Sequence, residues 1–170
     1  MSIEGDVEGL ARSLRRRRLC SPEAPRLELG TAEVERMLPH RGAMRLVDAV
    51  EAFDPRSRSL RARTWLGAEA LGFDGHFPDQ PVFPGVLQVE MAGQAGLCLG
   101  WLIDDSRDGP VDVRVLKIHH ATFLAPIEPD TLVTIEAQAL DHDGLTGLLA
   151  GQLWREEVLC STAIVEVYFV

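Results

Sequence analysis

The residues with the clearest chemical meaning in this chain are a histidine and a carboxylate that stand fourteen positions apart. His76 opens an extended, proline-rich stretch, and Glu90 follows in a segment whose composition predicts a very apolar helix. Histidine changes charge near neutral pH, and a carboxylate on an apolar helix face is costly unless it is paired or used in chemistry. The two residues therefore form a candidate acid/base pair, and Gly85 lies between them at the predicted start of the helix.

The segment around this pair resembles the 3-hydroxyacyl-[acyl-carrier-protein] dehydratases, a family with the hot-dog fold. The recurring core of that family reads His-Phe-Pro-x-x-Pro-Val-x-Pro-Gly-Val-Leu-x-x-Glu, with Gln four residues later, and residues 76–94 match every specified position. Upstream, residues 38–41 (Leu-Pro-His-Arg) and 46–48 (Leu-Val-Asp) resemble the amino-terminal signature of the family. The likeness covers residues 31–170, which is the usual size of one domain.

The resemblance implies a role for each residue of the pair. His76 would be the base that removes a proton beside the thioester carbonyl, with its ring held by the backbone carbonyl of Val82. Glu90 would be the acid that helps the hydroxyl group leave as water. The alternatives are a structural histidine that caps a turn and a carboxylate that pairs with arginine across an interface. In the family, the histidine and the glutamate of one site come from different subunits.

The resemblance also implies supporting roles for two further residues. The amide of Gly85 would stabilise the enolate-like charge, since the first amides of a helix lack intrahelical partners and the helix dipole favours negative charge there. Gly85 could also serve close packing alone. Gln94 lies one helical turn after Glu90 and would orient its carboxylate, although it could equally satisfy nearby backbone groups.

Other candidate groups carry less information. His119 and His120 are adjacent on a predicted strand, so they point to opposite faces and cannot bind one metal ion together. His40 and Arg41 are interpreted as structural or pocket-rim residues of the amino-terminal signature. The sequence implies no cofactor and no metal.

Composition limits the class of protein. The chain has 170 residues, a 46% apolar fraction and a net charge of −9, which predicts one globular domain with an appendage and argues against nucleic-acid binding. The three cysteines are widely spaced and fit reduced thiols in the cytoplasm. We find no secretory signal. Residues 85–103 approach membrane-spanning length but contain three polar residues, so we expect a buried core helix and no membrane association.

Residues 1–30 are predicted to form an extension that is partly helical, from about residue 7 to 19, or disordered. The run of four arginines at residues 15–18 is interpreted as a solvated helix face or arm, with docking of an acidic partner as the alternative. Residues 31–170 form the predicted domain. It contains a short helix over residues 31–37, the long helix over 85–103, and strands over 44–52, 59–65, 111–118, 132–140, 145–154 and 158–169.

One long apolar helix among five or six antiparallel strands must be wrapped by the sheet. This pattern predicts an α+β hot-dog fold, in agreement with the resemblance. Because hot-dog domains pair by extending one sheet into the other, we expect a homodimer or a trimer of dimers.

The resulting prediction is a hydro-lyase that dehydrates (3R)-3-hydroxyacyl thioesters to trans-2-enoyl thioesters in fatty-acid or polyketide-like biosynthesis. The partner would be acyl carrier protein or coenzyme A. Thr122 and Leu124 replace residues that are basic in the family and that meet the carrier protein there, which puts the carrier in question more than the reaction. The alternatives are a hot-dog thioesterase and a non-catalytic subunit that binds acyl carriers.

Overall fold

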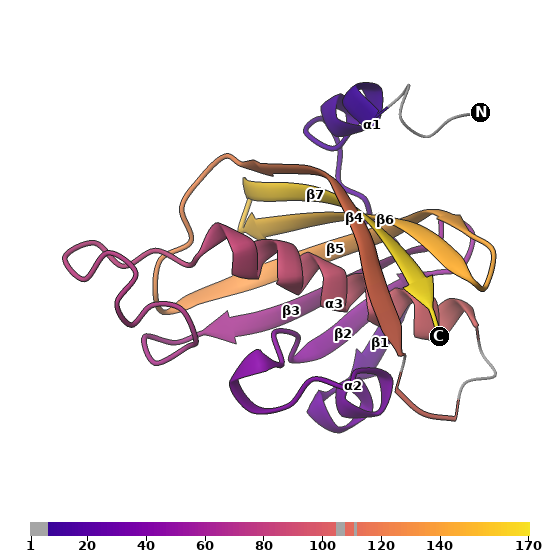
Figure 1. Cartoon of the computed structure of the whole chain (residues 1–170), viewed down its shortest axis with the longest axis horizontal. Helices are drawn as coiled ribbons and strands as arrows, with labels where there is room; N and C mark the ends of the chain where they lie inside the picture. The colour runs from indigo at the N-terminus through magenta and orange to yellow at the C-terminus, as the bar shows by residue number, and fades with distance from the viewer. Residues whose placement is uncertain (1–6, 105–107, 111) are drawn as a thin grey trace.

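The computed structural model describes residues 7–104, 108–110 and 112–170 and shows one curved antiparallel sheet wrapped around one long helix (Figure 1). Along the chain the elements are α1 (Val7–Ser13), β1 (Arg26–Leu29), α2 (Thr31–Met37), a 3-10 turn (Gly42–Met44), β2 (Ala49–Asp54), β3 (Ser59–Leu66), α3 (Gly85–Ile103), β4 (Val113–Phe123), β5 (Thr131–His142), β6 (Thr146–Arg155) and β7 (Val158–Phe169). The strand order is β1-β2-β3-β5-β6-β7-β4. The predicted hot-dog architecture is confirmed.

The sheet has seven strands in the described part of the chain, where the sequence predicted five or six. The additional strand is β1, which pairs with β2 at one edge of the sheet. It lies before residue 30, so the sheet begins within the segment that we assigned to the extension. The strand predicted from residue 44 begins at Ala49, because residues 42–44 form a 3-10 turn first. Residues 105–107 and 111 of the predicted turn and strand lie outside the described residues.

Helix α3 is enclosed by the concave side of the sheet. By length and composition it could cross a membrane, but ten of its residues are buried inside the protein. Strand β6 approaches it closely at Gly151, where a Cβ atom would lie 2.6 Å from the Cβ of Ala92. The first turns of α3 lie beside the loop over residues 67–84 and the end of β4, and residues from all three segments line the candidate site.

The opposite, convex side of the sheet is covered by α1 and the residues that follow it (Figure 1). Leu14 and Leu19 are buried there against Leu148, Ala150 and Ile164. The predicted helix over residues 7–19 is therefore shorter than expected, ending at Ser13, and the chain continues as a strap across the sheet. Residues 7–24 thus form part of the folded unit.

Candidate functional site

His76 lies in the loop that precedes α3, and its ring is fixed by the backbone. Its Nδ1 lies 2.8 Å from the carbonyl oxygen of Val82. A carbonyl oxygen only accepts, so Nδ1 carries the proton in the neutral ring and Nε2 presents a lone pair. The next residue, Phe77, has a φ of 56°, a left-handed conformation that non-glycine residues rarely adopt. The backbone therefore turns sharply directly after His76, whose ring lines the pocket described next.

The imidazole faces an open pocket of about 670 Å³ at the amino-terminal end of α3. Gly85, the first residue of the helix, lies on the wall of this pocket, and Phe123 of β4 lies opposite. A Cβ atom at Gly85 would be 2.8 Å from the Phe123 ring, so glycine permits their close approach. The first helical amides, which lack intrahelical acceptors, therefore open onto the same pocket as His76.

Glu90 is held in place by a hydrogen-bond network centred on Gln94. Its Oε1 accepts a hydrogen bond from Gln94 Nε2 at 2.8 Å. Gln94 is itself almost fully buried: its Oε1 accepts from the amide of Leu46, and its Nε2 also donates to the carbonyl of Met44, each at 2.8 Å. Every polar atom of the Gln94 side chain is hydrogen-bonded, so the amide group has one orientation. Its hydrogen bond then fixes the position of the Glu90 carboxylate.

His40 is a site residue whose contact the sequence did not predict. Its Nε2 lies 3.3 Å from Glu90 Oε1, whereas we interpreted it as a structural or pocket-rim residue. Its Nδ1 is buried without a hydrogen-bond partner in the described part of the structure. The only signal in the sequence was its position in the amino-terminal signature, since fifty residues separate it from Glu90.

The structure does not bring His76 and Glu90 into one pocket within a single chain. Glu90 does not line the pocket that contains His76 and Gly85. Helix geometry explains this, because Gly85 and Glu90 are five residues apart on α3 and side chains at that spacing point in different directions. The carboxylate side chain is 36% exposed, so one of its faces is open to solvent or to a second chain.

The remaining reactive groups are engaged elsewhere. His119 Nε2 lies 2.7 Å from Glu166 Oε2, and His120 Nε2 lies 2.9 Å from Thr122 Oγ1 and 3.4 Å from Thr162 Oγ1. The predicted opposite directions are wrong, because a register shift between Ile118 and His120 brings both rings to the face of the sheet that carries Thr162 and Glu166. Burial raises the pKa of the Cys98 thiol to about 12, so this thiol stays protonated at neutral pH. Within residues 7–104, 108–110 and 112–170, no group of three or more histidine, cysteine or acidic residues is arranged to hold a metal ion.

Comparisons with known proteins identify a family that the chain resembles over most of its length. A family model described as FabA-like domain matches residues 38–163. The 3-hydroxyacyl-[acyl-carrier-protein] dehydratase FabZ of Chlamydia trachomatis serovar L2 is 35% identical over 111 residues, which cover 65% of this chain and 72% of the relative. The enzyme of the same name from Campylobacter concisus is 29% identical over 139 residues, which cover 79% and 93% of the two chains.

Solved structures support the fold. The dehydratase heterocomplex ApeI:P from Xenorhabdus doucetiae matches with a TM-score of 0.66 and 19% identity over 81% of this chain and 90% of that chain. A mutant thioesterase from Pseudomonas aeruginosa matches with a TM-score of 0.54 and 22% identity over 72% and 80%. Dehydratases and thioesterases thus share this architecture, so the fold alone does not choose between the two reactions.

Proposed function

This chain belongs to the FabA-like domain family, and from that premise we propose that it is a hydro-lyase acting on (3R)-3-hydroxyacyl thioesters. The product is the trans-2-enoyl thioester, and the substrate is carried by acyl carrier protein, as the names of the relatives state for those enzymes. The pathway is fatty-acid biosynthesis in the cytoplasm. Thr122 and Leu124 stand where the family has basic residues, and for this reason we extend the proposal to polyketide-like biosynthesis.

His76 is the proposed base. With Nδ1–H donating to Val82, the lone pair on Nε2 accepts the proton from the carbon between the thioester carbonyl and the hydroxyl-bearing carbon. The imidazolium that forms keeps its bond to Val82, which stabilises the positive charge. The pocket is bordered mainly by apolar side chains, and a low local dielectric strengthens each such interaction.

The start of α3 is the proposed site for the charge that develops on the thioester oxygen. The amide of Gly85 lies at the positive end of the helix dipole, and preorganised backbone amides stabilise an oxyanion without further reorganisation. The glycine keeps this amide accessible, because a side chain there would collide with Phe123.

Glu90 of a second copy is the proposed acid. Its carboxyl group donates a proton to the hydroxyl on the adjacent carbon, the carbon–oxygen bond breaks, and water leaves. The proton on His76 then returns to Glu90 through water, which restores both groups. Gln94 holds Oε1 of the carboxyl group, so Oε2 is the oxygen that faces the substrate.

A dimer is proposed because one chain leaves His76 and Glu90 apart and leaves β4 as an exposed edge. Val115, Leu116 and Ile118 on this strand are each more than half exposed. An exposed apolar edge strand is a template for pairing with another chain. Association of two copies, alone or within a trimer of dimers, would cover this edge and complete each site.

The single observation that carries the proposed function is the fixed imidazole of His76 in the same pocket as the amino-terminal amides of α3. The test is mass spectrometry of a panel of 3-hydroxyacyl thioesters, on acyl carrier protein and on coenzyme A, after incubation with the pure protein. We expect loss of water and retention of the thioester.

Two results would overturn the assignment. Release of a free thiol without loss of water would identify a thioesterase. Tight binding of acyl carriers without any turnover, in protein that is folded and dimeric, would identify a non-catalytic carrier-binding subunit. The variant His76→Ala serves as the control, because an activity that survives this change does not come from the proposed site.

A further inference from the structure

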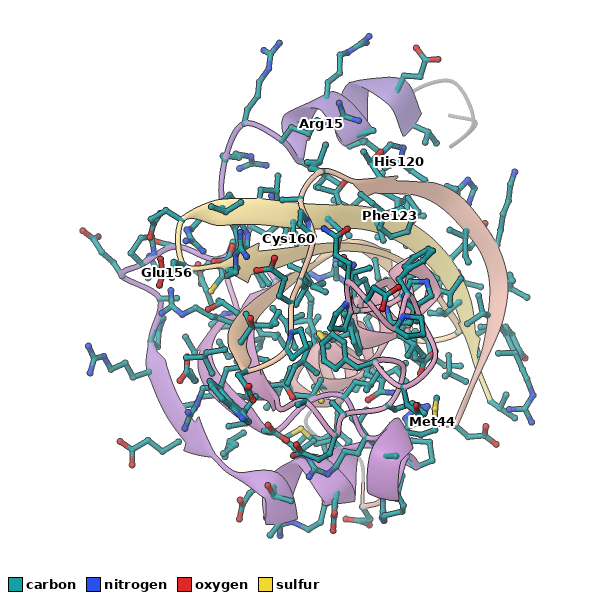
Figure 2. The ribbon with its side chains drawn as sticks, turned by 90° about the vertical axis from the view of Figure 1, so that its left-hand side faces the viewer. Arg15, Met44, His120, Phe123, Glu156 and Cys160 are labelled. Carbon is teal, nitrogen blue, oxygen red and sulfur yellow. The ribbon has the colours of Figure 1, made fainter. Side chains whose placement is uncertain are left out.

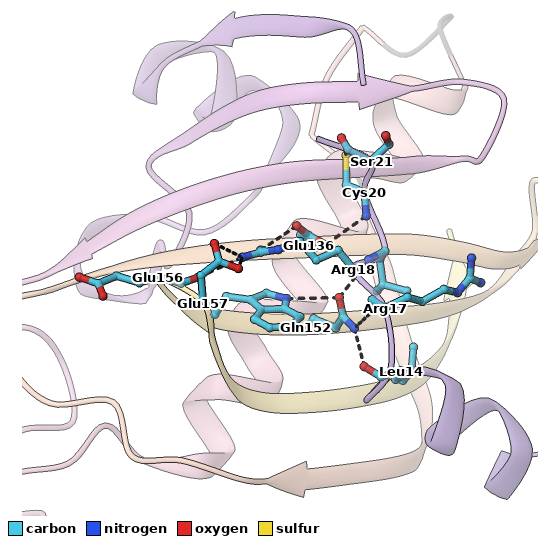
Figure 3. A network of polar contacts seen from close by, with 11 residues as sticks. Leu14, Arg17, Arg18, Cys20, Ser21, Glu136, Gln152, Glu156 and Glu157 are labelled. Atoms are coloured by element: carbon cyan, nitrogen blue, oxygen red, sulfur yellow. Dashed lines mark hydrogen bonds and ion pairs between the residues drawn. The ribbon is translucent and has the colours of Figure 1, made fainter. Parts of the chain in front are cut away.

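The four consecutive arginines of the amino-terminal segment do not share one environment. Arg18 turns toward the sheet, where its Nη1 lies 3.1 Å from Oε1 of the fully buried Glu136 and its guanidinium lies 4.2 Å from the centre of the Trp154 ring. Figure 3 shows this inward position. Arg15, Arg16 and Arg17 remain exposed. Arg18 is therefore an anchor, and its neighbours are presented to solvent.

The backbone that carries the exposed arginines is fixed on the sheet. Gln152, a fully buried residue of β6, donates from Nε2 to the carbonyl oxygens of Leu14 and Arg17. Its Oε1 accepts from the amide of Leu19. These bonds (Figure 3) hold residues 14–19 from both ends, so the arginines between them occupy defined places on the protein surface.

These exposed arginines carry unbalanced positive charge. We call Arg12, Arg15, Arg16 and Arg17 the arginine surface. Within the described residues, no carboxylate forms an ion pair with any of the four. Residues 7–20 contain five arginines and one glutamate, a charge of +4. The whole chain carries −9, so the rest of the protein carries −13 and repels acidic partners, whereas this surface attracts them.

The arginine surface borders the strand that forms one wall of the candidate site. Arg15 Nη2 donates to Thr122 Oγ1 of β4 at 3.1 Å. The following residue, Phe123, points to the opposite face of the strand and lines the pocket with His76. Figure 2 shows Arg15 above the strand that carries His120 and Phe123. The positive surface and the pocket thus lie on opposite sides of the same strand end.

The neighbouring histidine does not add to this charge. His120 Nε2 contacts Thr122 Oγ1 at 2.9 Å, and the pKa of His120 is lowered by burial and by the nearby charge of Arg15. The imidazole is therefore neutral at neutral pH, and the positive field in this region comes from arginine. Because guanidinium groups stay charged at all physiological pH values, the surface has no pH switch.

We propose that the arginine surface binds an acidic face of the carrier protein that delivers the thioester, a proposal that rests on the dehydration reaction proposed above. Docking there places the carrier at the end of β4, and its acyl arm reaches around the strand end into the pocket with His76 and Gly85. Electrostatic attraction of this kind raises the rate of association and depends on ionic strength.

The test compares two charge-reversed proteins in a catalytically inactive background, so that binding is measured without turnover. Arg16→Glu/Arg17→Glu alters the arginine surface while leaving the contact of Arg15 with Thr122 intact. Arg56→Glu is the matched control, since Arg56 is an exposed arginine in the turn between β2 and β3. The probe is an acidic acyl carrier protein loaded with a 3-hydroxyacyl chain, titrated by calorimetry into Glu90→Gln protein carrying either change.

We expect the double change to weaken carrier binding by about tenfold or more at low salt and to flatten its dependence on salt concentration. The control change should leave affinity within about twofold, because surface charges far from the interface contribute little. Equal affinities in all proteins, or an equal loss in the control, would overturn the docking assignment. Thermal unfolding confirms that each variant is folded.

A second measurement separates this inference from the proposed reaction. In otherwise wild-type protein, the double change should lower kcat/KM for the carrier-bound substrate and leave turnover of a short pantetheine thioester unchanged. If the protein dehydrates the short thioester but the arginine changes do not alter carrier binding, the docking site is refuted and the proposed reaction stands. Arginine-dependent carrier binding without dehydration on any substrate would refute the reaction and keep the docking site.

Discussion

At the scale of single residues, the candidate site is a set of side chains whose orientation is determined by backbone atoms. The carbonyl of Val82 sets the tautomer of His76, and the backbone at Met44 and Leu46 sets Gln94, which sets Glu90. General acid–base catalysis requires such placement before it requires a tuned pKa. Two predictions test these residues.

The first prediction concerns the acid/base pair. His76→Ala and Glu90→Gln should each lower kcat by about a hundredfold or more, because each removes one proton-transfer group. Neither side chain belongs to the hydrophobic core, so the midpoint of thermal unfolding should change little. Steady-state kinetics on the best substrate of the thioester panel provides the measurement. A variant that keeps near wild-type turnover would remove that residue from the mechanism.

The second prediction concerns Gln94 as a positioning residue. Gln94→Leu leaves the Leu46 amide and the Met44 carbonyl without partners, which should cost about 1–3 kcal/mol of stability, and it frees the Glu90 carboxylate. Turnover should fall beyond what the lost stability explains, and the pH–rate profile should change. Gln152→Leu is the control, a buried glutamine on the opposite face of the sheet, which should lose stability but keep the profile. Identical profiles in both variants would leave Gln94 with a structural role only.

At the scale of elements, the amino-terminal strap is joined to the sheet by polar groups that lie beneath it. Glu136 on β5 is fully buried and accepts from Arg18 and from the amide of Cys20. Gln152 on β6 holds the backbone of residues 14–19. Both residues point to the outer face of the sheet, where a hot-dog domain without a strap would expose them to water.

The third prediction measures this attachment. Arg18→Ala leaves the buried Glu136 carboxylate without its charge partner, which should lower the free energy of unfolding by roughly 3 kcal/mol. The same change in a Glu136→Gln background should cost much less, because no buried charge is left unpaired. Urea denaturation of the four proteins closes this double-mutant cycle. The exposed pair of Arg155 and Glu128 provides the comparison, and Arg155→Ala should cost less than about 1 kcal/mol. Additive effects of the two changes would show that Arg18 and Glu136 are not coupled.

At the scale of the whole molecule, one chain has all the residues of the proposed site but does not bring them into one pocket. His76 and the start of α3 share a pocket from which Glu90 is absent, and the apolar edge of β4 is exposed. Association of two copies would account for both features, because it would cover the β4 edge and each copy would contribute its Glu90 to the pocket of the other.

The fourth prediction tests this exchange. Inactive His76→Ala and Glu90→Gln proteins, unfolded and refolded together, should recover up to about a quarter of the wild-type activity, because half of a random mixture is heterodimer and each heterodimer has one intact site. Native mass spectrometry establishes the fraction of heterodimer. Each variant refolded alone should stay inactive. Confirmed heterodimers without recovered activity would place both residues of a site in the same chain.

The sequence alone determined the parts of this protein that depend on local pattern. The predicted long helix has the observed bounds, Gly85–Ile103, because Pro84 and Gly85 mark its start and its apolar composition persists to its end. The strand over residues 158–169 is also found at its predicted bounds. The segment from His76 to Gln94 identified the family, because its residues are specific and lie close together in the chain.

Only the tertiary structure decided the contacts that join distant parts of the chain. The sequence did not predict β1, whose four residues carry too little pattern to identify a strand, nor the contact of His40 with Glu90. In the sequence, the four arginines form one uniform run. In the structure, Arg18 turns inward to pair with Glu136 and the other three are exposed. The sequence did not predict this difference, because Glu136 lies 118 positions from Arg18 and only folding brings the two together. Local propensity decides where helices and strands form, but the direction of each side chain depends on which buried surface covers it, and that surface exists only in the folded protein.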